Sequence, residues 1–204
     1  VRFSEGQTVY SDDSLQTICE TSPLVYVAGQ PVEADIMNGV WLSVDLKGLN
    51  GSDIVGYRAR RHAPLIDLSK IGYYPMEEFW EPIYRPKSGH IILNPEDFYI
   101  MASRECLRVP AEYSSEMMAY ETTAGELRVH YAGFFDPGFG CGVDGQGGQG
   151  TTGVLEIRSH DVPFVLEHGQ KICRMVYERL SEVPEKIYST AIGSNYAGQS
   201  LKLA

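Results

Sequence analysis

Short runs of β-branched and aromatic residues recur along most of the chain, and Gly, Pro, Asn and Asp separate them as they do at turns between strands. These runs predict strands over residues 40–46, 54–60, 90–93, 98–103, 127–135, 154–160 and 172–180. Little in the pattern is typical of parallel βαβ units. The sequence therefore predicts a mainly β fold, a sandwich or a barrel made of many short strands.

One helix is expected near the N-terminus, over residues 11–19, where Ser and Asp residues precede apolar residues at helical spacing. A second short helical turn is expected at residues 75–81. We accordingly divide the chain into residues 1–24, an N-terminal strand or linker with the short helix, and residues 25–204, the main domain.

Composition limits the possible functions. Of the 204 residues, 22% are charged and 43% are hydrophobic, as in ordinary globular proteins. No apolar run of membrane-spanning or signal-peptide type occurs, so we expect a cytoplasmic protein without a membrane partner. The formal net charge of −10 argues against a nucleic acid polymer as partner. A nucleoside triphosphate would need a local basic pocket, a divalent cation or a neighbouring chain.

Two local features are expected to be structural. Cys19, Cys106, Cys141 and Cys173 stand far apart, which predicts reduced thiols in or near the core rather than disulfides or a zinc site. Glycine dominates residues 138–150, which predicts a mobile hairpin excursion. The alternative, a phosphate-cradling loop, lacks the Lys-Ser/Thr pair and helix that should follow it.

Glu156 is the best candidate for water activation. The zinc-binding motif of many nucleobase deaminases is absent, and the five histidines lack metal-ligand spacing, so no metal site is predicted. A metal-free hydrolase needs a carboxylate or a histidine held beside the water. Strand alternation places Val154, Glu156 and Arg158 on one face. The structural alternative is a solvent-facing Glu beside Arg158.

Several segments resemble the dCTP deaminase family of the dUTPase-like superfamily. Residues 131–139 read YAGFFDPGF, similar to the family's T-A-x-x-I-D-P-G-(W/F), and residues 154–156 read VLE, as in the family. Residues 93–95 and 162–172 resemble its L-x-P strand entry and its Pro, then Leu-x-x-Gly-x-x-Ile segment. The Tyr-x7-Tyr-x2-Gln spacing of Tyr188, Tyr196 and Gln199 resembles the tail that closes over the nucleotide.

The resemblance implies a dUTPase-like distorted β-barrel or jelly roll with one or two short helices. It implies hydrolytic deamination of dCTP to dUTP and ammonia, with Glu156 as the general acid/base for attack of water at C4. By the same resemblance, the backbones of Val154 and Leu155 lie along the base and that of Ala132 helps to shape the water site. Asp136 supports the turn or contacts the sugar, and the tail residues bind the nucleotide. No tightly bound cofactor is implied, and Mg²⁺ arrives only with the triphosphate.

Two departures concern phosphate binding. The family carries Ser-Ser-x-x-Arg before the Ala132 segment, whereas here Ser114 and Ser115 are followed by Met118, and an ungapped count puts Thr123 at the Arg position. Asn195 stands where the family has Lys. Active sites of this superfamily form between subunits, so we expect a homotrimer, or a pseudo-trimeric assembly in which the other half of a tandem protein supplies the cation.

Two alternatives stay open. A dUTPase-type pyrophosphatase would use Asp136 and release pyrophosphate without ammonia, leaving Glu156 unexplained. A non-catalytic structural or regulatory domain of a tandem protein would explain the degenerate Ser/Arg block.

Overall fold

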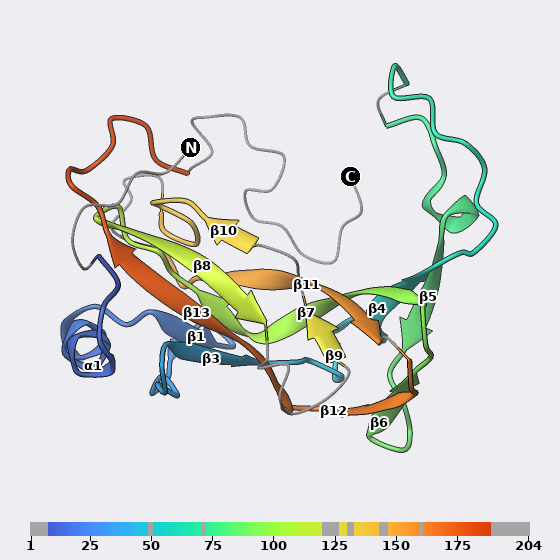
Figure 1. Ribbon diagram of the computed structural model, residues 1–204, viewed down its shortest axis with the longest axis horizontal. Helices are drawn as coiled ribbons and strands as arrows, with labels where there is room; N and C mark the ends of the chain where they lie inside the picture. Colours follow the sequence, from blue (N-terminus) through green and yellow to red (C-terminus); the bar gives the residue numbers. More distant parts are fainter. Residues whose placement is uncertain are drawn as a thin grey trace.

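The protein is described here by a computed structural model, which covers residues 8–48, 51–70, 72–119, 127–129, 133–142, 147–159 and 161–188. Two helices precede or interrupt the strands (Figure 1), namely α1 (Asp12–Thr21) and the 3-10 helix η2 (Met76–Glu78). The strands are β1 (Val25–Val27), β2 (Gln30–Pro31), β3 (Val40–Ser43), β4 (Ile54–Ala59), β5 (Trp80–Tyr84), β6 (His90–Leu93), β7 (Phe98–Leu107), β8 (Tyr113–Ala119), β9 (Leu127–Val129), β10 (Gly133–Phe135), β11 (Thr151–Ser159), β12 (Phe164–Glu167) and β13 (Lys171–Arg179).

The described strands form three sheets. A seven-stranded sheet follows the order β2-β1-β7-β11-β9, with β4 also beside β7 and β5 beside β4. A four-stranded sheet has the order β10-β8-β13-β3, and β12 pairs with β6 in a separate ribbon. All the strand pairs are antiparallel. The hydrogen bond from Asp45 N to Ala102 O (3.0 Å) ties the end of β3 to β7 and so joins the two larger sheets.

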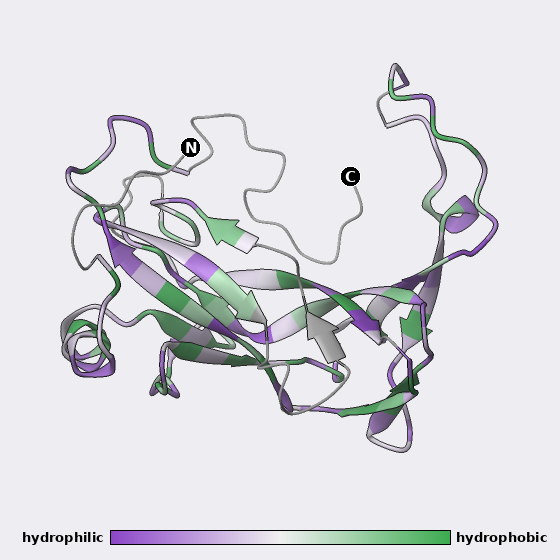
Figure 2. Ribbon diagram, viewed as in Figure 1, coloured by the Kyte–Doolittle hydropathy of each residue, from purple (hydrophilic) through white to green (hydrophobic). Residues whose placement is uncertain are grey.

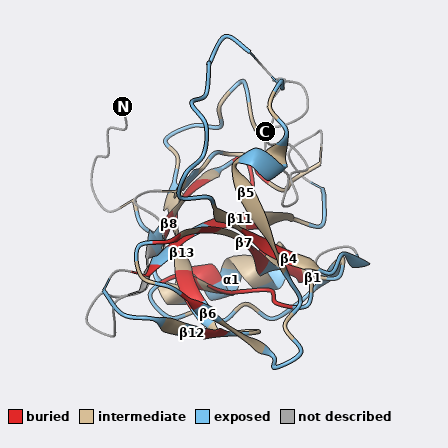
Figure 3. Ribbon diagram, turned by 90° about the vertical axis from the view of Figure 1, so that its right-hand side faces the viewer, coloured by how far each residue is buried: buried red, intermediate tan, exposed pale blue. Residues whose placement is uncertain are grey.

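The core lies between these sheets. Apolar and polar residues alternate along many strands (Figure 2), and the buried residues gather on the inner parts of strands such as β7 and β11 (Figure 3). Side chains with 0% exposure come from both larger sheets and from the ribbon, for example Leu42, Met101, Leu155, Leu166 and Met175. One continuous apolar core therefore fixes which face of each strand points outward.

Helix α1 packs on this core through a local sequence signal. The Ser11 hydroxyl accepts a hydrogen bond from Ser14 N (3.3 Å), and Asp12 and Asp13 occupy the first turn, where the helix dipole favours negative charge. Leu15 is 1% exposed within the core. The division of the chain at residue 24 stays a prediction, although Leu15 shares its core with the strands of the main domain.

Most predicted elements are present with shifted ends. The mainly β fold is confirmed, and the second helical turn is found at residues 76–78 within the described part of the chain. The predicted strand 98–103 continues to residue 107, and strand 154–160 begins earlier, at residue 151. The predicted strand 127–135 is found as β9 and β10, with residues 130–132 outside the described part. Among the described helices, none is long and apolar enough to span a bilayer.

Candidate active site

Glu156 lies in the middle of β11, in the seven-stranded sheet. Leu155 and Ile157 on either side of it are 0% exposed in the core, whereas Glu156 and Arg158 are exposed on the opposite face. The alternation predicted for this strand is therefore confirmed. Within the part of the chain that the structure describes, the Glu156 side chain is exposed, so the burial expected for a water-activating carboxylate is not found there.

The surroundings of Glu156 are set by strand register. Its Cα partner on β7 is Ile100, and the partner of Ile100 on β4 is Tyr57. Tyr57 is 6% exposed and Ile100 is partly buried, so an apolar strip extends from Glu156 across the sheet. Val154, the predicted base-binding neighbour, is half-buried on the same face and pairs with Ala102.

Arg158 brings a positive charge to the same face. Its guanidinium lies 5.5 Å from the centre of the Phe98 ring, a cation–π arrangement, and its Cα partner on β9 is Arg128. The sequence pattern placed Arg158 on the face of Glu156, but it gave no sign of Phe98 as its partner, because that contact depends on how β7 aligns with β11.

The expected water-site neighbour lies just outside the described residues. On β9, Val129 is the Cα partner of Ile157. Ala132 itself, like Tyr196 and Gln199, falls outside the described part of the chain, so its predicted role is not tested.

Asp136 and Tyr188 lie away from Glu156, where the turn that begins at Asp136 contacts Tyr188. Asp136 is exposed at the start of a tight turn that continues through Gly140, and its carbonyl accepts a hydrogen bond from Phe139 N (3.1 Å). Tyr188 N donates to Pro137 O (2.6 Å), and the Tyr188 ring lies 5.5 Å from that of Phe139. The structure thus brings two predicted nucleotide-binding segments together in one corner.

This corner and Glu156 lie along the same strand. Gly150 N, just before β11, donates to Gly140 O (3.1 Å), so the turn abuts the beginning of β11. Thr151 and Glu156 are five residues apart, or roughly 17 Å along the strand at about 3.4 Å per residue. The Glu156 carboxylate and the Asp136–Tyr188 corner therefore lie at different positions along β11 and are not neighbours.

The glycine-rich excursion is a hairpin-like turn, as expected, but its described part is tied down. Gly138 N donates to Val109 O (2.7 Å), Val109 N donates to Phe139 O (2.8 Å), and Gly142 N donates to Gly147 O (2.8 Å). The mobility of this excursion stays a prediction, although residues 138–142 and 147–150 make these backbone hydrogen bonds. The sequence alone does not distinguish glycines that allow close backbone packing from glycines that make a loop flexible.

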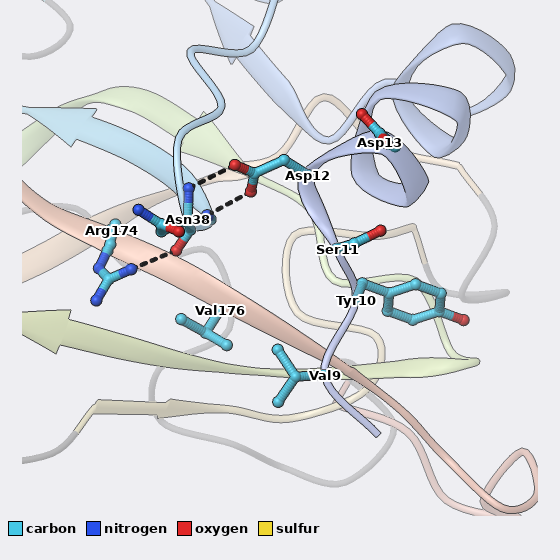
Figure 4. Close-up of a pocket in the computed structure, with 9 residues that line it drawn as sticks. Val9, Tyr10, Ser11, Asp12, Asp13, Asn38, Arg174 and Val176 are labelled. Atoms are coloured by element: carbon cyan, nitrogen blue, oxygen red, sulfur yellow. Dashed lines mark hydrogen bonds between the residues drawn. The ribbon is translucent and has the colours of Figure 1, made fainter. Parts of the chain in front are cut away.

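A cavity of about 450 Å³ lies beside the start of α1 (Figure 4). The Asp12 carboxylate accepts hydrogen bonds from Asn38 N (2.7 Å) and Gly39 N (3.0 Å), and Arg174 donates to Asn38 O (2.6 Å). These polar groups hold the turn before β3. None of the predicted site residues lines this cavity. The lining residues are Val9, Tyr10, Ser11, Asp12, Asp13, Asn38, Gly39, Arg174 and Val176.

Comparison with known proteins decides the family. A family model described as "2'-deoxycytidine 5'-triphosphate deaminase (DCD), C-terminal domain" matches residues 11–204. The chain belongs to the dCTP deaminase family.

Relatives within the dCTP deaminase family differ in how much of them this chain covers. It is 29% identical over 129 residues to a "dCTP deaminase, dUMP-forming" of Corynebacterium jeikeium (strain K411), a match of 61% of this chain and 63% of that protein. It is 20% identical over 195 residues to a "dCTP deaminase, dUMP-forming" of Methanopyrus kandleri, covering 94% of this chain and 92% of that protein.

A solved structure shares the fold. The 2'-deoxycytidine 5'-triphosphate deaminase from Agrobacterium tumefaciens superposes with a TM-score of 0.76 at 40% sequence identity. The match covers 88% of this chain but 50% of that one, so this chain spans about half the length of that relative. The dUTPase-like fold predicted from the sequence is thereby confirmed.

The serines that align with the family's phosphate-binding block are not available to a ligand. Ser114 is 4% exposed and Ser115 is 0% exposed, and the Ser115 hydroxyl donates to Val176 O (3.0 Å) inside the four-stranded sheet. Met118, where the family's Arg is expected, is 38% exposed and apolar. Thr123 lies outside the described residues. Within the described residues, this chain therefore offers no exposed hydroxyl or cation at Ser114, Ser115 or Met118.

The cysteines are structural, as expected. All four are free thiols, and Cys173 is fully buried. Burial raises the pKa of Cys19 and Cys141, although the nearby Arg108 guanidinium partly opposes the rise at Cys141. Among the residues that the structure describes, no group of three or more His, Cys, Asp or Glu side chains could hold a metal ion, so we name no metal ligands.

Proposed function

We propose that the chain catalyses the hydrolytic deamination of dCTP to dUTP and ammonia, with Glu156 as the general acid/base. The observation that carries the proposal is the position of Glu156. In a chain of the dCTP deaminase family, the VLE carboxylate stands at mid-strand on the open face of β11, with half-buried Val154 beside it.

The chemistry needs one carboxylate and one water. Glu156 takes a proton from the water as its oxygen attacks C4 of cytosine, and passes this proton to N3 as the C4=N3 double bond opens. Glu156 then moves the proton of the new C4 hydroxyl to the amino group, so that the C4–N bond breaks, ammonia departs and the C4 carbonyl of uracil forms. Such proton transfer contributes roughly 10²- to 10⁴-fold to rate.

The nucleotide is proposed to lie along β11. The base sits at Val154 and Glu156, and the sugar and phosphates run toward the corner formed by Asp136 and Tyr188. Two distances support this orientation: Tyr188 N lies 2.6 Å from Pro137 O, which joins the tail to the turn, and Gly150 N lies 3.1 Å from Gly140 O, which joins the turn to β11. The tail residues Tyr196 and Gln199 would then close over the nucleotide, which carries Mg²⁺ as counter-ion.

A second domain is proposed to complete the phosphate site. Ser114 and Ser115 are buried, Met118 replaces the expected cation, and the chain carries a net charge of −10, all of which disfavour a triphosphate on this chain alone. A homotrimer or a pseudo-trimeric pair with a second domain would supply the missing cation. Equal deamination rates for this chain as a homotrimer and for a longer two-domain protein would refute the proposal that a second domain supplies the cation.

A dUMP-forming activity is the second candidate. The Corynebacterium and Methanopyrus relatives are both named as dUMP-forming, and Asp136 is exposed in the corner where the phosphates are proposed to lie. In that case pyrophosphate would be released together with ammonia. A dUTPase-type pyrophosphatase without deamination, or a non-catalytic domain, would leave Glu156 without a role.

The decisive variant is Glu156→Gln, which keeps the shape of the side chain and removes the base. We expect ammonia release from dCTP to fall about 10²- to 10⁴-fold, while dCTP binding measured by calorimetry persists. Glu167→Gln is the matched control, because Glu167 is also exposed on a strand, β12; its ammonia release should stay within about twofold. Unchanged ammonia release in Glu156→Gln would refute the assignment.

A further inference from the structure

Gly138 stands where the Asp136 turn touches the start of the C-terminal tail. Its φ of +92° lies in the left-handed region, which favours glycine. A Cβ placed on Gly138 would lie 2.9 Å from Ile187 Cβ, 2.9 Å from Tyr188 O and 3.1 Å from Tyr188 N. Any side chain at position 138 would therefore displace the backbone at residues 187–188.

The tail rests on the turn through contacts that need this closeness. Tyr188 N donates to Pro137 O (2.6 Å), and the Tyr188 ring packs 5.5 Å from the Phe139 ring at 47°. Phe139 is itself 9% exposed and held edge-on by Phe135 at 4.8 Å. The surface that receives Tyr188 is thus fixed by the core, and the place of Tyr188 follows from it.

Neighbouring Gly140 serves a different purpose. A Cβ there would overlap the carbonyl oxygen of Leu107 and lie 2.8 Å from Thr151 N, so Gly140 lets the turn pack on β7 and β11. By contrast, the three atoms nearest to a Cβ on Gly138 all belong to Ile187 and Tyr188. The two glycines of this turn therefore have different roles. Gly140 allows the turn to pack on β7 and β11, and Gly138 allows residues 187 and 188 to pack on the turn.

We propose that Gly138 is a positioning residue that sets the place of Tyr188. The proposal rests on the proposed deaminase function, in which Tyr188 binds the nucleotide. Gly138 has no side chain and its N–H donates to Val109 O (2.7 Å), so its proposed influence on turnover passes through its contact with Tyr188.

The test compares Gly138→Ala with Gly89→Ala. Gly89 has a φ of +80° and no heavy atom within 4 Å of an added Cβ, so the control introduces similar backbone strain without the contact. We expect Gly138→Ala to raise KM for dCTP about tenfold, the effect of losing one good contact, with kcat changed less. Gly89→Ala should leave both within about twofold. Similar effects from both variants would overturn the proposal.

A double-mutant cycle with Tyr188→Ala separates positioning from a general structural effect. If Gly138 acts through Tyr188, adding Gly138→Ala to Tyr188→Ala should change KM less than about twofold, since contacting sites are not additive. A full, additive loss in the double variant would contradict the inference.

Trypsin provides a readout that does not depend on activity. Lys186 is exposed and precedes Ile187, so cleavage after Lys186 reports how firmly residues 187–188 are held. We expect the 1–186 fragment to appear about tenfold faster in Gly138→Ala than in Gly89→Ala. Faster cleavage without any ammonia from the native protein would reject the deaminase proposal yet keep the positioning role. Equal cleavage rates, or failure of Gly138→Ala to fold, would reject the positioning role.

Discussion

At one end of β11, the turn through Gly138 and Gly140 is packed so closely on neighbouring backbone that no side chain fits. Five residues into the strand, Glu156 stands exposed on an open face whose neighbours are half-buried apolar side chains. The first end receives Tyr188 from the same chain, whereas the Glu156 side chain is exposed within the described residues. The Asp136–Tyr188 corner is thus closely packed, and the surroundings of Glu156 are open in this part of the chain.

The largest effect on stability is expected in the turn that contains Gly140, before the beginning of β11. Gly140→Ala would force a Cβ into the Leu107 carbonyl at a φ of +68°, and neither strand can move without breaking its pairing. We expect the free energy of unfolding to fall by about 4 kcal/mol, the range of severe backbone and packing faults. Urea unfolding measures it. Gly51→Ala, also at positive φ but in open space, should cost no more than about 1 kcal/mol. Similar losses of unfolding free energy for Gly140→Ala and Gly51→Ala would show that the turn at Gly140 is packed no more closely than a surface loop.

The next effect separates the two faces of β11. Leu155→Ala removes a side chain of 0% exposure from the core, and we expect it to cost about 3 kcal/mol of unfolding free energy. Val154→Ala, one residue away on the half-buried outer face, should cost about 1 kcal/mol. If Val154→Ala proved as costly as Leu155→Ala, the outer face would have to be covered in solution.

The smallest effect is expected for the stability of Glu156→Gln. Because Glu156 is exposed, its contacts with other surface groups contribute little, and the free energy of unfolding should change by less than about 0.5 kcal/mol. Thermal unfolding with and without dCTP measures both stability and binding. A loss above about 2 kcal/mol would indicate a structural carboxylate instead of a reactive one.

Much of this arrangement could be predicted from local pattern. The alternation around Glu156 gave the correct inner and outer faces of β11, because one side of the strand is buried in a core. Ser11 and the two following Asp residues marked the start of α1, because capping is a local interaction. The Pro-Gly pair at residues 137–138 marked a turn for the same reason.

Other features depend on contacts between distant segments. Ser114 and Ser115 are buried by β13 and the core, which the sequence did not predict, because a Ser-Ser-Glu-Met-Met run does not resemble a strand. The meeting of Phe139 with Tyr188 joins residues about fifty positions apart, which no local pattern specifies. The firm packing of the glycine-rich turn was missed because its cause lies in the backbone of β7.

We propose that this chain deaminates dCTP through Glu156. The most direct test measures ammonia and pyrophosphate together while dCTP is consumed, in the native protein and in Glu156→Gln. Our account predicts one ammonia for each dCTP consumed, lost in the variant, whether or not pyrophosphate follows. Pyrophosphate without ammonia, or ammonia release that survives Glu156→Gln, would contradict it.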